Sequence, residues 1–71
     1  MSGLKKRSFA IAGHRTSVAL EPEFWAILEA EAKRLNASLA GLVSTIDAGR
    51  GPRPLASALR VHALSIATKA G

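Results

Sequence analysis

A chain of 71 residues without cysteine forms at most one domain and has no disulfide to reinforce its small core. Its 48% apolar content, with two phenylalanines, one tryptophan and no tyrosine, predicts a compact helical protein and argues against a disordered one. The two histidines, His14 and His62, lie far apart in the sequence, so no metal site is expected and oligomerisation is the reinforcement that remains.

Membrane, secretion and enzyme classes find little support. The apolar run near the start is too short for a signal peptide, and no segment approaches the roughly 18 apolar residues of a membrane span. The serines lack a G-x-S-x-G context, and "AGRGP" lacks the lysine of a phosphate-binding loop. We therefore expect a cytoplasmic protein that is not an enzyme and needs no cofactor.

The net charge of +5 is distributed unevenly. Four basic residues and no acidic residue occur before Glu21, whereas six basic and five acidic residues nearly cancel from there on. A basic arm over residues 1–12 joined to a neutral body is typical of a protein that binds a polyanion, nucleic acid first and an acidic membrane second. A solvated tail that keeps the protein soluble has equal weight on charge alone.

Residues 14–20 alternate in the manner of a β-strand. One side of the pleat carries Thr16, Val18 and Leu20, and the other carries Arg15, Ser17 and Ala19. Upstream, Phe9 and Ile11 have the opposite parity, and Gly13 suits a bulge or bend between the two phases. The upstream segment either extends the strand or forms a flexible arm.

Two helices joined by a short corner follow. Pro22 suits the first position of a helix over residues 22–35, and Asn36 can end it in a left-handed conformation. Ser38 has the chemistry of an N-cap for a second helix that Gly49 stops. The apolar stripes that define the two helices are Trp25, Leu28, Ala32 and Leu35, widened by Phe24 and Ile27, and then Leu39, Leu42, Val43 and Ile46.

A third helix is predicted after the turn "GRGPRP", from Leu55 to the end of the chain. Leu55, Leu59, His62 and Ile66 form one line along it, and Val61 and Leu64 form another. Because few polar positions are left for a solvent side, this helix should be buried, either against its own domain or across a subunit interface.

The order of strand, helix, short corner and serine-capped helix resembles the ribbon-helix-helix family of MetJ/Arc-type DNA-binding proteins. The resemblance rests on "RTSVALEPEFWAIL" and "LNASLAGLVSTI", roughly half of the chain. "GHRTSVALE", "FW" and "LASALRV" are also similar to a small bacterial subgroup with a basic arm before the strand and an extra helix after the core.

The resemblance implies a mainly α fold in which two chains each contribute one strand to an antiparallel ribbon, giving an intertwined homodimer. Its divisions would be the arm (1–12), the ribbon-helix-helix core (13–50) and a C-terminal helix extension (51–71). The implied dimer core comprises Thr16, Val18, Leu20, Phe24, Trp25, Leu28, Leu42, Val43 and Ile46.

The resemblance further implies a transcriptional regulator whose ribbon enters the major groove of double-stranded DNA. Arg15, Ser17 and Ala19 would face the bases, and Lys5, Lys6, Arg7, Ser38 and Leu39 would contact phosphates. The alternative is a dimeric interaction module, antitoxin-like or a scaffold. Its apolar C-terminal helix would bind another protein or build a tetramer, with DNA binding weak or absent.

Overall fold

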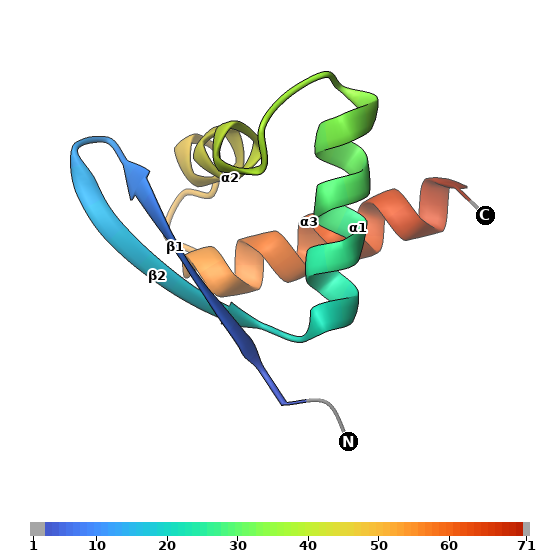
Figure 1. Ribbon diagram of the computed structural model, residues 1–71, viewed down its shortest axis with the longest axis horizontal. Coiled ribbons are helices and arrows are strands. Elements are labelled where there is room, and N and C mark those ends of the chain that lie inside the picture. Colours follow the sequence, from blue (N-terminus) through green and yellow to red (C-terminus); the bar gives the residue numbers. More distant parts are fainter. Residues whose placement is uncertain (1–2, 71) are drawn as a thin grey trace.

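The computed structural model describes residues 3–70, which form two strands followed by three helices (Figure 1). The elements are β1 (Lys5–Ile11), β2 (His14–Leu20), α1 (Pro22–Arg34), α2 (Leu39–Ala48) and α3 (Leu55–Ala70). The first two residues of the predicted arm and the last residue of the predicted C-terminal extension lie outside the described residues.

The two strands form an antiparallel hairpin within the single chain. Ala12 and Gly13 connect them, and their φ angles of 52° and 81° give the left-handed conformation at both central positions that a type I′ hairpin turn requires. The expectation that residues 14–20 have no partner strand in their own chain is therefore wrong, because residues 5–11 supply it. For the same reason, most of the predicted 1–12 arm is a strand.

The hairpin turns one face toward the helices and the other away from them. Phe9 and Ile11 from β1 and Val18 and Leu20 from β2 are buried on the inner face. Val18 and Leu20 thus point into the core as predicted, and Thr16 on the same side of β2 is half-buried. Residues that pair across the two strands lie on the same face. Because the two-residue turn pairs odd-numbered positions of β1 with even-numbered positions of β2, the apolar residues of both strands lie on one side.

Local sequence signals fix the ends of α1. Pro22 occupies the first turn, where its missing N–H has no intrahelical partner to lose. At the other end Asn36 has a φ of 59°, its amide donates to the carbonyl of Lys33 over 3.0 Å, and the amide of Ala37 donates to that of Ala32 over 2.8 Å. This pattern is a Schellman motif with asparagine in the left-handed position, as the sequence predicts.

Helix α3 completes the core by contacting both other helices and β2. Ala58, Leu59 and Ala63 are buried there, so its inner side packs within its own chain. The expectation that nearly all of this helix is buried is wrong on its other side, where Val61 and Leu64 are 48% and 62% exposed. No helix among residues 3–70 is long and apolar enough to cross a membrane.

All residues predicted for a dimer core except Thr16 contribute to the core of one chain. Phe24 and Ile46 are partly buried and pack against it. The predicted members that are buried in it are Val18, Leu20, Trp25, Leu28, Leu42 and Val43.

Candidate nucleic-acid interface

The side of the hairpin turned away from the helices, called here the outward face, carries short polar and basic side chains. Its members are Lys6, Ser8 and Ala10 from β1 and Arg15, Ser17 and Ala19 from β2. Five of them are exposed, and Ala19 is half-buried. The predicted reading residues of β2 therefore do project away from the core, and β1 adds three neighbours to them.

The register arranges these residues in three cross-strand pairs. Lys6 lies opposite Ala19, Ser8 opposite Ser17, and Ala10 opposite Arg15. The two serine hydroxyl oxygens at the centre are 2.9 Å apart and form a hydrogen bond. A cation therefore stands at each end of the outward face, on opposite strands, with a hydroxyl pair between them.

The positive charge of the outward face is not neutralised by neighbouring carboxylates. The hairpin contains no acidic residue. Among residues 3–70 the four ion pairs join Arg7 to Glu29, Arg34 to Glu31, Arg50 to Asp47 and Arg60 to Glu21. Since neither Lys6 nor Arg15 takes part in them, both keep their charge available for an external anion.

In the helical part of the chain, in contrast, three arginines pair with nearby carboxylates: Arg34 with Glu31, Arg50 with Asp47 and Arg60 with Glu21. A hydrogen bond from its own backbone amide, followed by one from Arg60, lowers the pKa of Glu21 below its ordinary value of 4.5. Arg34 lowers the pKa of Glu31 in the same direction, chiefly through a side-chain hydrogen bond. Both carboxylates therefore stay ionised at neutral pH and offset the nearby arginines.

Arg7, which the sequence predicts to contact phosphate, is already bonded to other residues of its own chain. It lies on the inner side of β1, where its Nη1 donates to Glu29 Oε2 over 2.6 Å and its guanidinium carbon sits 5.3 Å from the centre of the Trp25 ring. The indole Nε1 of Trp25 in turn donates to the carbonyl of Lys5 over 2.7 Å. These contacts, called here the Trp25 latch, fasten β1 to α1. Lys5, which is also predicted to contact phosphate, keeps its side chain exposed.

The start of α2 is the second predicted phosphate site. Ser38 caps it by accepting a hydrogen bond from the amide of Gly41 over 3.0 Å, which leaves the amides of Leu39 and Ala40 at the helix end. The first turn of α2 contains no acidic residue that would repel an anion. The side chain of Leu39 is half-buried and packs against the core, so only its backbone is suited to phosphate.

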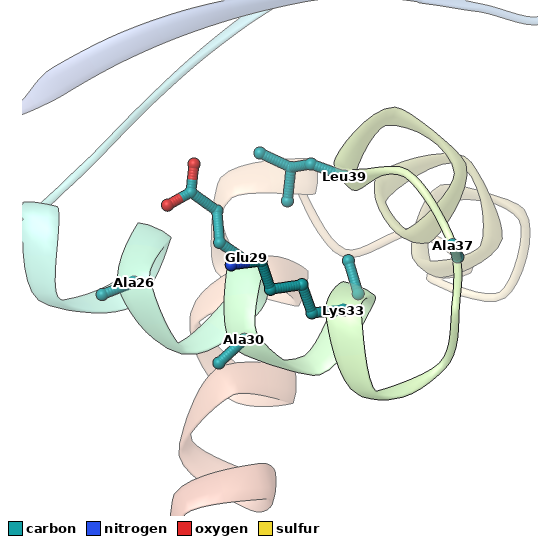
Figure 2. Close-up of a pocket in the computed structure, with 7 residues that line it drawn as sticks. Ala26, Glu29, Ala30, Lys33, Ala37 and Leu39 are labelled. Atoms are coloured by element: carbon teal, nitrogen blue, oxygen red, sulfur yellow. The ribbon is translucent and has the colours of Figure 1, made fainter.

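Beside this helix end lies a shallow depression between α1 and the corner that leads into α2 (Figure 2). Glu29 and Lys33 extend over it from α1, and Ala37 and Leu39 line it from the corner and α2. Lys33 lines the same depression as Leu39, and Glu29 is already paired with Arg7. This corner belongs to the helical layer, whereas the outward face lies on the opposite side of the hairpin.

Sequence reasoning missed Ser8 and Ala10 as members of the outward face. The signal was present: Phe9 and Ile11 have the opposite parity to Val18 and Leu20, which a two-residue hairpin turn produces. Within residues 3–70 no three histidines or carboxylates gather in a way that could hold a metal ion.

The comparison with known protein families agrees with this geometry. A family model described as a ribbon-helix-helix domain matches residues 4–67, which span both strands and nearly all of α3. No curated protein and no solved structure matches the chain. The match confirms the ribbon-helix-helix family and the mainly α fold class that the sequence resemblance implies. The chain belongs to the ribbon-helix-helix family, in general a family of DNA-binding regulators.

Proposed function

We propose that this protein binds double-stranded DNA by placing the outward face of its hairpin in the major groove, and that it acts as a transcriptional regulator in the cytoplasm. The observation that supports the proposal most directly is the pair of uncompensated cations, Lys6 and Arg15, on the exposed side of a two-stranded ribbon. The major groove is about 12 Å wide and admits such a ribbon.

The residues of the outward face differ in the DNA groups that they can recognise. Arg15 can donate two hydrogen bonds to O6 and N7 of guanine, a contact that discriminates between bases by about 1 to 3 kcal/mol. Ser17 donates or accepts with little preference, and Ala19 offers only apolar contact to a thymine methyl. Lys6 adds a point charge without the planar fork of arginine.

Phosphate contacts would add affinity without reading sequence. Lys5 and Lys6 lie exposed at the start of β1. The amides at the start of α2 around Ser38 and Leu39 suit an anion, but they are weaker candidates than the two lysines because they lie on the helical side of the hairpin. Arg7 is a weaker candidate because its guanidinium already bonds Glu29 and stacks on Trp25.

The homodimer expected from the sequence stays a prediction, but the argument from an unpaired strand no longer supports it. A strand without a partner would have required a second chain, but β1 pairs with β2 in the same chain. Sedimentation or native mass measurement of the protein alone tests for a dimer directly.

Titration of a fluorescent duplex followed by anisotropy tests DNA binding. The logarithm of the binding constant should fall linearly with the logarithm of salt concentration, by about 0.9 for each phosphate neutralised. Arg15→Ala should weaken binding about tenfold or more by removing both the charge and the guanine contact. Lys69→Ala is the control, because Lys69 lies in the last turn of α3 on the helical layer. Absence of binding at low salt would exclude the proposal.

The alternative function, a protein-interaction module, has one observation in its favour. Val61 and Leu64 leave an apolar strip exposed on α3. Val61→Ser with Leu64→Ser should abolish any association through this strip while leaving DNA binding unchanged. If these substitutions remove DNA binding as well, the strip belongs to the DNA-binding assembly.

A further inference from the structure

A groove of about 580 Å³ lies between the end of α2 and α3. Its lining residues come from α2, from the turn that follows it and from α3, and none comes from the hairpin. Ile46, Ala58 and Val61 supply its apolar side chains. This surface, called here the α2–α3 groove, therefore shares no residue with the outward face.

An exposed apolar strip continues the groove along α3. Val61 lines the groove and is 48% exposed, and Leu64, three residues further along the helix, is 62% exposed. Of the four large apolar side chains that are exposed among residues 3–70, only these two lie within one helical turn of each other. They form a patch rather than isolated positions, and such a patch gains free energy when another surface removes it from water.

The rim of the groove carries an arginine without a carboxylate partner. From Gly49 to the end of the sequence there are four arginines and lysines and no acidic residue. Arg50 pairs with Asp47, whereas Arg53 is exposed and takes part in none of the four ion pairs among residues 3–70. Both arginines line the groove. Arg53 can therefore offer a free guanidinium to a carboxylate of a bound partner.

We propose that the α2–α3 groove binds an acidic amphipathic helix of a second protein. The apolar side of that helix covers Val61 and Leu64, and one of its carboxylates pairs with Arg53. Both features are needed to account for the surface, because the patch attracts apolar side chains and the unpaired arginine selects those with an acidic neighbour. The inference does not rest on the proposed DNA binding, since the groove contains no residue of the hairpin.

The length of the groove sets the length of the partner segment. On α3 the groove extends from Ala58 to Ser65, which is about 10 Å at a helical rise of about 1.5 Å per residue. About two turns of a partner helix cover this distance. Its apolar residues would therefore recur at spacings of three, four and seven, the arrangement by which amphipathic helices occupy apolar grooves.

The chemistry of the surface favours this partner over two others. Duplex DNA offers phosphates to Arg53 but presents a polar surface that leaves Val61 and Leu64 without apolar contacts. A second copy of the chain that used the same patch would form an isologous contact. That contact would bring the arginines of two identical surfaces together, and the adjacent carboxylate of Asp47 already bonds Arg50. Like charges that face each other oppose such an association.

Selection from a displayed library tests the partner's chemistry. The library consists of a stable helical bundle in which one exposed helix face is randomised, and the full chain serves as the bait. The enriched faces should combine apolar residues at helical spacing with at least one aspartate or glutamate. Enrichment of faces without an acidic residue, or of no face at all, overturns the proposal.

Fluorescence anisotropy with an enriched bundle then tests the residues of the groove. Val61→Ser with Leu64→Ser should weaken binding about tenfold or more. Arg53→Glu should weaken it about tenfold, and replacing the acidic residue of the bundle by lysine should restore binding to this variant. Lys69→Glu is the matched control, because it makes the same charge reversal in the last turn of α3, outside the groove.

The substituted side chains are exposed, so the variants should keep their fold, which circular dichroism verifies. Unchanged binding by Arg53→Glu, or an equal loss with Lys69→Glu, overturns the specific pairing with Arg53 and with it the proposal.

Two further outcomes would assign the surface to another occupant and overturn the proposal. If duplex DNA displaces the bundle and Arg53→Ala weakens duplex binding as much as Arg15→Ala does, the groove belongs to the DNA interface. If the protein alone forms a dimer that Val61→Ser with Leu64→Ser dissociates, a second copy covers the strip. Loss of duplex binding with intact bundle binding would instead exclude only the proposed DNA binding.

Discussion

The two faces of the hairpin are built from the same fourteen strand residues and differ in composition and environment. The inner face buries large apolar side chains against three helices, whereas the outward face carries only serine, alanine and two cations. Because neighbouring residues on a strand point to opposite sides, the sequence can change one face without disturbing the other. Stability and the proposed DNA binding are thus separable by single substitutions in adjacent positions.

The strongest test of the contrast compares Leu20→Ala with Ser17→Ala. Leu20 is fully buried, so its truncation should cost about 2 to 5 kcal/mol of unfolding free energy and can leave much of so small a chain unfolded. Ser17 is exposed, and its replacement should cost less than about 0.5 kcal/mol. Urea unfolding followed by circular dichroism measures both. The isomeric change Leu20→Ile, expected to cost less than about 1.5 kcal/mol, distinguishes lost packing from a general intolerance of substitution.

Arg7 and Lys6, adjacent residues on opposite faces, provide the second test. Arg7→Ala removes the contacts with Trp25 and Glu29 and should lower the unfolding free energy by about 1 kcal/mol. Lys6→Ala should leave stability nearly unchanged and weaken DNA binding. If Arg7→Ala instead weakens only DNA binding, Arg7 has the phosphate-contacting role that the sequence predicts and the Trp25 latch contributes little.

The turn offers a third test, in which two neighbouring substitutions have opposite signs. Ala12 has a φ of 52°, which costs a residue with a Cβ about 1 kcal/mol, so Ala12→Asn should stabilise the hairpin by up to about that amount. Gly13→Ala should destabilise it by about 1 kcal/mol through backbone strain alone, since no atom lies within 4 Å of the added Cβ. Thermal unfolding midpoints that move in the same direction would contradict the type I′ turn.

Acid should have the smallest effect. The pKa values of Glu21 and Glu31 are lowered in the folded chain, so their stabilising contribution is present above about pH 4.5 and is lost as the pH falls through their folded values. The thermal midpoint should therefore fall slightly between pH 5 and pH 3. The double substitution Glu21→Gln and Glu31→Gln should flatten this dependence. An equally steep fall in the double variant would assign the effect to other carboxylates.

The helices and their ends could be predicted from the sequence because their signals are local. Pro22, Asn36 and Ser38 each act on the backbone within a few residues, and all three have their predicted roles. The hairpin was harder, because alanine is uncommon at positive φ and "Ala-Gly" is not among the favoured turn pairs. From the sequence alone, the reversal of parity between Ile11 and Val18 therefore indicates a bulge or bend at Gly13.

Tertiary packing limited the rest of the prediction. Both lines of α3 are apolar, so its sequence does not determine which one faces the core. In the structure Leu59 and Ala63 are buried in the core while Leu64 stays exposed. The outward direction of Arg15, Ser17 and Ala19 followed from alternation alone. Their partners Lys6, Ser8 and Ala10 depended on a pairing across the turn that alternation within one strand cannot supply.

The Ala12–Gly13 turn also affects how the protein is made. When a ribbon joins two chains, folding is bimolecular and stability depends on protomer concentration. Here the two strands are two residues apart, so they meet by closing a minimal loop, an event on the microsecond scale for a hairpin. The hairpin itself can therefore form at any protein concentration, whereas an unfolding midpoint that rises with protein concentration would report the predicted homodimer. A newly synthesised chain can thus form its hairpin before it meets a second molecule of itself.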